Sequence, residues 1–152
     1  MPWLKTIVSF TAGLLVFDIL AATVSTQVVL NEIAALGVEI SLQTRLSTTL
    51  HDILGLLPTF SPIFGLGFLI AFFTAAQLVK RTGLSADTMF AGAGFVSVLV
   101  TLVTIEAVFG LTALAAAREL AGVVLLSLCG APAGVVYLRL NTHLQAVKRP
   151  QP

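Results

Sequence analysis

The fold is decided by residues 4–30, LKTIVSFTAGLLVFDILAATVSTQVVL, a long apolar run with one carboxylate, Asp18, near its middle. A transmembrane helix needs about 20 mostly apolar residues to cross roughly 30 Å of hydrocarbon. The run is also longer than the apolar core of a secretory signal, which has about 7–15 residues. We therefore expect an uncleaved helix that spans a membrane.

The rest of the chain has the composition of an integral membrane protein. Hydrophobic residues make up 57% of the 152 residues and charged residues 10%, with a mean hydropathy of +1.03. That is more apolar surface than a soluble domain of this size can bury. Three further runs, at residues 60–79, 89–114 and 117–140, are long enough to span. We predict one all-α domain over residues 1–152, with four transmembrane helices in an antiparallel bundle and a cytoplasmic tail at 141–152.

The basic residues predict an orientation in the membrane. If both termini lie on one side, that side carries Lys5, Lys80, Arg81, Arg139, Lys148 and Arg149, and the other carries Arg45 and Arg118. Cytoplasmic loops are enriched in Lys and Arg, so both termini are expected in the cytoplasm. The expected location is the cytoplasmic (inner) membrane of a bacterium. The net charge of +1 provides no basic surface for nucleic acid. Membrane lipids are therefore expected partners and nucleic acid is not.

Capping and turn residues predict where the spans begin. Ser61 followed by Pro62 has the form of an N-cap and a first-turn proline, so it predicts the start of the second span. Ser85 and Asp87 suit the start of the third span, because a Ser oxygen can cap free amides and an acidic side chain complements the helix dipole. Residues 110–117 are expected to turn the chain tightly into the fourth span.

Residues 38–57 have the pattern of an amphipathic helix. Apolar residues recur at spacings of three, four or six, and polar residues fill much of the other side. The apolar positions are Ile40, Leu46, Leu50, Ile53, Leu54 and Leu57. We expect a helix on the outer membrane surface. It would either be a lid that fills space between the first two spans or roof a cavity open to the lipid, with Arg45, His51 and Asp52 near the entrance.

Asp18 is the strongest candidate for a functional residue. An Asp at the centre of a span costs roughly 2.5–3.5 kcal/mol, so its side chain should face protein or water. It belongs to a seam with a seven-residue period, made of Thr11, Asp18, Ser25 and Glu32, which keeps one stripe facing a neighbouring helix. Three roles stay open: a protonated carboxyl that holds helices together, a proton- or cation-binding group, and a contact to another subunit.

Glu106 is the second acid within a predicted span. It lies in the third span, about 9 Å from the middle toward the outer side. Arg118 opens the fourth span on that side, and its long side chain could reach down to neutralise Glu106. The alternative is that Arg118 and Glu119 anchor the helix at the interface. Asp18, Glu106 and Arg118 are therefore the candidate ion- or proton-binding residues.

Small residues predict close contacts between helices. Gly130 and Gly134 lie four residues apart in the fourth span, a spacing that lets another backbone approach, and Pro132 between them should kink the helix. The same interpretation applies to Gly65 and Gly67 in the second span and to Gly92 and Gly94 in the third. The pattern indicates tight packing, a dimer contact or a ligand-facing hinge.

Signatures of catalysis are missing from the sequence. There is no Gly-rich phosphate loop, no nucleophile elbow and no HExxH run. Cys129 is the single cysteine, and His51 and His143 fall on opposite sides of the membrane in the expected topology, so they cannot share a metal or a haem. We expect no catalytic residue, no metal and no cofactor, and the sequence favours a protein that is not an enzyme.

Three functions fit these observations. The first is a non-enzymatic accessory subunit that assembles with itself or with a larger membrane complex through small-residue helix faces. The second is a small proton- or cation-coupled transporter that uses Asp18 with Glu106. The third is a lipid-binding or lipid-processing protein with a cavity under the helix at 38–57. The first predicts that Asp18→Asn is tolerated, and the second predicts that it abolishes function.

Overall fold

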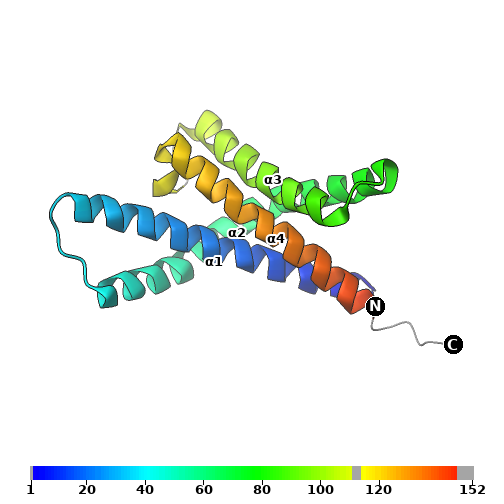
Figure 1. Ribbon diagram of the computed structural model, residues 1–152, viewed down its shortest axis with the longest axis horizontal. Coiled ribbons are helices and arrows are strands. Elements are labelled where there is room, and N and C mark those ends of the chain that lie inside the picture. Colours follow the sequence, from blue (N-terminus) through cyan, green and yellow to red (C-terminus); the bar gives the residue numbers. More distant parts are fainter. Residues whose placement is uncertain (1, 111–113, 147–152) are drawn as a thin grey trace.

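The computed structural model describes residues 2–110 and 114–146, whose regular structure is helical. The elements are α1 (Pro2–Ala35), α2 (Leu42–Thr82), α3 (Ala86–Phe109), the 3-10 helix η1 (Ala115–Arg118) and α4 (Leu120–Ala146) (Figure 1). All four α-helices are long and apolar enough to cross a membrane. The predicted all-α class and the four helices of spanning length and composition are thereby confirmed.

The four helices pack as a ring in the order of the chain. Helix α1 packs against α2, α2 against α3, α3 against α4, and α4 returns against α1. The first turns of α1 lie beside the last turns of α4, where Thr6 Oγ1 donates a hydrogen bond to Asn141 Oδ1 at 3.4 Å and Lys5 donates one to the Leu144 carbonyl. Helix α1 therefore lies across the ring from α3.

A cluster of aromatic rings joins all four helices. The ring of Phe72 on α2 stacks on Tyr137 of α4 with a centroid distance of 4.8 Å and lies 5.8 Å from Phe90 of α3. Phe10 of α1 is 6.3 Å from both Phe72 and Tyr137. Helices in lipid associate through van der Waals packing rather than through burial from water. Contacts among these aromatic side chains provide that packing at the centre of the bundle.

Glycines set the spacing between α3 and α4. A Cβ added to Gly94 would lie 2.0 Å from the Gly130 carbonyl oxygen, and one added to Gly134 would lie 1.9 Å from that of Phe90. No side chain fits at these distances, so the two backbones are in direct contact. Gly94, Gly130 and Gly134 thus make the predicted close contacts within the chain. Pro132 lies inside α4, which continues through it.

Helix α2 differs from the prediction. It runs without interruption from Leu42 to Thr82, so residues 42–57 of the predicted surface helix form its first turns rather than a separate helix, and residues 38–41 precede it. Its N-cap is Ser41, whose side chain accepts a hydrogen bond from the Thr44 amide, whereas Ser61 lies inside the helix. Pro58 and Pro62 lie inside the helix, and each removes one helical hydrogen bond. Ending the helix in apolar surroundings would leave several backbone groups without hydrogen-bond partners, which costs more.

The ends of α3 and α4 also differ from the predicted bounds. Ser85 and Asp87 take the expected N-cap and first-turn positions, but α3 stops at Phe109 because Gly110 adopts a left-handed φ of 61°. Residues 111–113 of the predicted turn lie outside the described residues. Helix α4 extends to Ala146, so the predicted tail at 141–152 begins as helix, and its residues 147–152 are not described.

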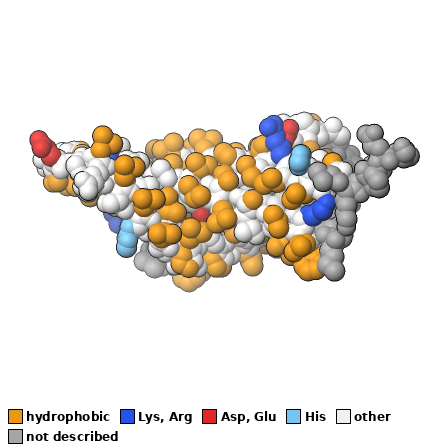
Figure 2. Space-filling model, turned by 90° about the horizontal axis from the view of Figure 1, so that it is seen from below, with side chains coloured by type: hydrophobic (Ala, Val, Ile, Leu, Met, Phe, Trp, Pro, Cys, Tyr) orange, Lys and Arg blue, Asp and Glu red, His pale blue; other side chains and the backbone are white. Residues whose placement is uncertain are grey.

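The surface matches a protein that is surrounded by lipid. Figure 2 shows apolar side chains over the middle of one face, with charged side chains mostly toward its two ends. Large side chains such as Leu66, Leu69 and Phe73 are 61–69% exposed in the middle of α2. Apolar surface on this scale is ordinary in hydrocarbon and uncommon on a soluble monomer.

Candidate functional site

Asp18 lies at the middle of α1, and it is the one charged residue among those described that is buried. Its exposed fraction is 6%. The Ser61 hydroxyl, on α2, donates a hydrogen bond to Asp18 Oδ2. Since a polar group without a partner in an apolar interior costs free energy, this contact stabilises both side chains and fastens α1 to α2.

The space beside Asp18 is small. The cavity that it lines with Leu56, Phe60, Leu114 and other residues has a volume of about 10 Å³. A cavity needs about 10–15 Å³ of space, measured in the same way, to hold a single water molecule. The described part of the chain therefore leaves room beside the carboxyl for one water at most, and this geometry suits a helix-to-helix contact better than a path for a hydrated ion.

Further polar contacts continue from Asp18 along α1 and α2. Thr26 Oγ1 donates a hydrogen bond to Asp52 Oδ2 at 2.7 Å. Arg45 Nη1 donates to Gln27 Oε1 at 2.9 Å and to Asn31 Oδ1 at 3.1 Å. Gln27 Nε2 also donates to Thr49 Oγ1 at 3.2 Å. We call this set the polar ladder; its members are Asp18, Thr26, Gln27 and Asn31 on α1 and Arg45, Thr49, Asp52 and Ser61 on α2.

The polar ladder explains how the amphipathic segment is oriented. Arg45, Thr49 and Asp52 lie at positions i, i+4 and i+7 of α2, so they share one face of the helix, and that face meets α1. The predicted entrance residues Arg45 and Asp52 therefore point at α1, while His51 is exposed. The leucines of the same turns are left on the outside: Leu42 is 78% exposed, Leu46 63%, Leu50 61% and Leu54 73%.

The predicted seven-residue seam is buried only in its middle. Asp18 and Ser25 are buried, whereas Thr11 and Glu32 are exposed. An ideal helix drifts by about 20° per heptad relative to a seven-residue repeat, so the ends of a three-heptad stripe turn away from the contact.

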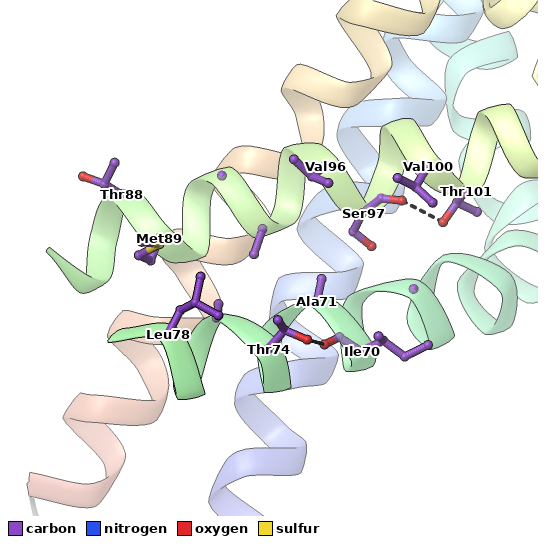
Figure 3. Close-up of a pocket in the computed structure, with 14 residues that line it drawn as sticks. Ile70, Ala71, Thr74, Leu78, Thr88, Met89, Val96, Ser97, Val100 and Thr101 are labelled. Atoms are coloured by element: carbon purple, nitrogen blue, oxygen red, sulfur yellow. Dashed lines mark hydrogen bonds between the residues drawn. The ribbon is translucent and has the colours of Figure 1, made fainter. Parts of the chain in front are cut away.

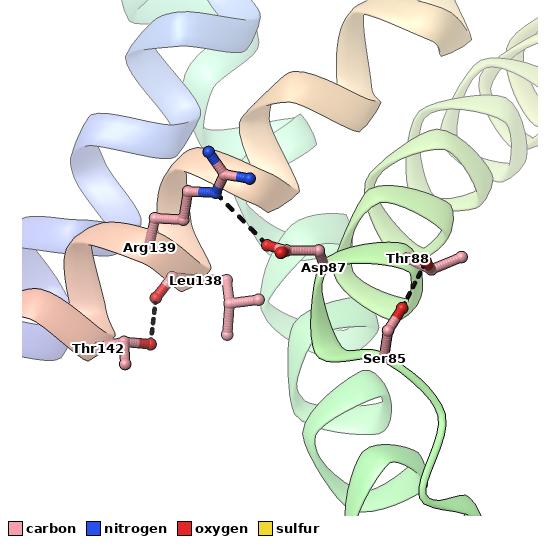
Figure 4. Close-up of polar contacts among 6 residues, drawn as sticks. All are labelled: Ser85, Asp87, Thr88, Leu138, Arg139 and Thr142. Atoms are coloured by element: carbon pink, nitrogen blue, oxygen red, sulfur yellow. Dashed lines mark hydrogen bonds and ion pairs between the residues drawn. The ribbon is translucent and has the colours of Figure 1, made fainter.

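The other candidate charges are not brought to Asp18. Glu106 and Arg118 are both exposed, and α3, which carries Glu106, lies across the ring from α1. Over the described ranges, the ion pair that forms joins Arg139 Nε to Asp87 Oδ1 at 3.5 Å (Figure 4), and none joins Arg118 to Glu106. Nor do these ranges contain three His, Cys, Asp or Glu side chains grouped to hold a metal ion.

A larger hollow, which the sequence did not reveal, lies between α2 and α3. This groove has a volume of about 460 Å³ and is lined mostly by apolar and small residues (Figure 3). Two of the glycines predicted for helix packing border it. A Cβ on Gly67 would lie 2.7 Å from Thr101 Oγ1, so Gly67 does pack against α3, whereas a Cβ on Gly92 would meet nothing within 4 Å. A cavity beneath residues 38–57 stays a prediction.

Comparison of the chain with protein-family models, with curated proteins and with solved structures found no match. The four apolar helices indicate a membrane protein. Its function has to be argued from the polar ladder, the exposed leucines and the groove.

Proposed function

We propose that the chain is a non-enzymatic integral membrane subunit that assembles with copies of itself or with a larger membrane complex. The observation that carries the proposal is the leucine row, defined as Leu42, Leu46, Leu50 and Leu54, which is 61–78% exposed on the first turns of α2. Most of the row lies on the distal hairpin, residues 26–53, which extends past η1 and the end of α3 (Figure 1).

The direction of the side chains in the distal hairpin supports a protein contact. Three polar residues of the first turns of α2, Arg45, Thr49 and Asp52, are held by α1, while Ser47 and His51 are exposed beside the leucine row. Large apolar side chains stay outside, on a part of the molecule that projects beyond the other helices. Helix α2 has 41 residues, about 60 Å, which is longer than a hydrocarbon core of roughly 30 Å, so we place its first turns outside the hydrocarbon. Exposed apolar patches there mark interaction sites, and leucines at i and i+4 form a ridge that packs into the groove of another helix.

The polar residues of the ladder and the glycines of α3 and α4 make their contacts within the chain, which supports an assembly role over catalysis. Asp18, Asp52 and Arg45 each hydrogen-bond within the polar ladder. Gly94 and Gly130 contact each other inside the chain. We therefore assign assembly to the leucine row rather than to these small-residue faces.

We further propose an antiparallel bundle in the bacterial cytoplasmic membrane, with both termini in the cytoplasm and the distal hairpin on the outer side. The positive-inside rule supports this orientation. A membrane-impermeant maleimide applied to intact cells should label Ser47→Cys, on the distal hairpin, and should not label Ser85→Cys, between α2 and α3. The opposite labelling would reverse the orientation.

The assembly proposal is tested by the mass of the intact particle in mild detergent. We expect the wild type to form a stoichiometric complex, with itself or with other subunits, which the double variant Leu46→Gln/Leu50→Gln dissociates. The control variant Ser47→Ala/His51→Ala changes the exposed polar side of the same turns and should keep the complex. A monomeric wild type, or a complex that survives the leucine substitutions while helicity is retained, would refute the proposal.

A proton- or cation-binding site at Asp18 and Ser61 is our second proposal. It is favoured by the burial of this one carboxylate and by the two prolines near it on α2. Pro58 and Pro62 have no N–H, so the carbonyls of Leu54 and Pro58 lack their helical donors. If this proposal holds, Asp18→Asn abolishes proton-coupled uptake or cation binding in proteoliposomes while the particle mass stays unchanged. Equal activity of the variant and the wild type would refute it.

A further inference from the structure

We propose that the groove between α2 and α3 binds an acyl chain of an acidic phospholipid, with Arg81 placed at its open end to meet the headgroup phosphate. This site is independent of the leucine row and goes beyond the assembly role.

The length of the groove matches one leaflet of a bilayer. It follows α2 from Gly67 to Leu78 and α3 from Thr88 to Thr101, which correspond to about 16 and 20 Å of helix. Half of a hydrocarbon core of roughly 30 Å is about 15 Å. A straight helix of another protein that crosses the membrane would need a groove about twice as long.

One end of the groove is closed by direct contact between the two helices. A Cβ on Gly67 would lie 2.7 Å from Thr101 Oγ1 and 2.9 Å from Ser97 Oγ, so α2 and α3 nearly touch there. The other end of the lining, at Leu78 and Thr88, lies beside the short connection between the two helices, and we take it as the open end. A chain that enters at this open end would reach the closed end at about the middle of the bilayer.

The walls of the groove suit a saturated or unsaturated hydrocarbon chain. Its lining includes the small residues Ala71 and Ala75 on α2 and Gly92 and Ala93 on α3, which leave room for a chain. The hydroxyls of Thr74 and Thr101 donate to carbonyls of their own helices, those of Ile70 and Ser97, each at 2.8 Å (Figure 3). Because their donors are already used, these two threonines do not require a polar ligand.

The open end of the groove carries a positive charge. Arg81 follows Leu78 by three residues, so it lies within about 60° of the groove face of α2, whereas Lys80 lies about 200° from Leu78 on the far side. Both side chains are exposed. The acid at this end, Asp87, is paired with Arg139 of α4 at 3.5 Å (Figure 4). Arg81 is therefore left to attract an anionic headgroup, and Lys80 is its natural control.

The chain site is tested with phosphatidylglycerol that carries a photoreactive group on its acyl chain, added to the full-length protein in mild detergent. We expect cross-links to map to Ala71, Val96 and their neighbours in the groove. Gly92→Leu should abolish them, because the new side chain fills the groove and its Cβ meets nothing within 4 Å. Gly55→Leu, at an equally open position of α2 outside the groove, should leave them unchanged.

The headgroup site is tested by comparing phosphatidylglycerol with phosphatidylcholine. We expect Arg81→Gln to lower the preference for phosphatidylglycerol about fivefold, the effect of one basic residue near an anionic lipid surface, and Lys80→Gln to leave it within twofold. Unchanged cross-linking in Gly92→Leu, equal effects of the two charge variants, or cross-links that map outside the groove would each overturn the proposal. Loss of lipid with an unchanged number of protein subunits in the particle would separate this site from assembly through the leucine row.

Discussion

Ser61 of α2 donates a hydrogen bond to the carboxyl group of Asp18, midway along α1. The two residues are 43 positions apart in the chain. Each has a polar side chain that would otherwise face lipid from an apolar helix. Their contact begins the polar ladder, which continues through Thr26 and Asp52 to Arg45. The ladder holds the start of α2 against α1, and so it decides which side of the distal hairpin is left exposed.

Removing the donor of this pair should destabilise the fold modestly. We expect Ser61→Ala to lower the free energy of unfolding by about 1 kcal/mol, which is the contribution of a typical interhelical hydrogen bond in a membrane. Asp18→Asn should cost less, because its amide oxygen still accepts the hydrogen bond. Unfolding in mixed micelles by titration with a denaturing detergent measures both values. A larger loss for Asp18→Asn than for Ser61→Ala would show that the Asp18 carboxyl does more than accept this bond.

The crossing of α3 and α4 should not tolerate a methyl group. Gly94→Ala places a Cβ 2.0 Å from the Gly130 carbonyl oxygen, so we expect a loss of about 1–3 kcal/mol from overpacking, or more if the helices separate. Gly92→Ala, two residues away, meets open space and should be neutral or stabilising by up to about 1 kcal/mol. Similar results for the two variants, measured by the same unfolding assay, would contradict the crossing described here.

The aromatic cluster should be the most sensitive part of the interior. Phe72 is 3% exposed and contacts rings from all the other helices, whereas its neighbour Phe73 is 67% exposed. We expect Phe72→Ala to cost about 3–5 kcal/mol and Phe73→Ala to cost under about 1 kcal/mol. Thermal unfolding followed by circular dichroism compares them directly. A larger loss of stability for Phe73→Ala than for Phe72→Ala would mean that Phe73, and not Phe72, is the residue of α2 that faces the other helices.

The polar ladder should control the stability of the distal hairpin locally. Thr26→Val removes the donor to Asp52 while keeping the shape of the side chain, so amide hydrogen exchange in residues 26–53 should become several-fold faster, as expected for a loss of about 1 kcal/mol. Thr23→Val is the control, because the Thr23 hydroxyl bonds only to the Ile19 carbonyl of its own helix. Equal exchange rates in both variants would mean that the ladder does not hold the hairpin.

Much of the fold could be predicted from local properties of the chain. Apolar length located the four spans, and Ser85 with Asp87 marked the start of α3. The start of α2 was predicted wrongly, because Ser61-Pro62 has the same local chemistry as a helix N-terminus. The Ser61 hydroxyl instead donates a hydrogen bond to Asp18, a residue of another helix. A cap and a tertiary hydrogen bond call for the same side chain, so the local sequence does not separate them.

By itself the sequence determined that the chain forms four helices able to cross a membrane and that Asp18 should turn away from lipid. Both follow from hydropathy and from the cost of burying a carboxyl, which are local properties. Only the tertiary structure decided that Asp18 meets Ser61, that the leucine row stays exposed and that a groove opens beside Gly92. Helical periodicity determines which residues share a face, but packing between helices determines which faces meet.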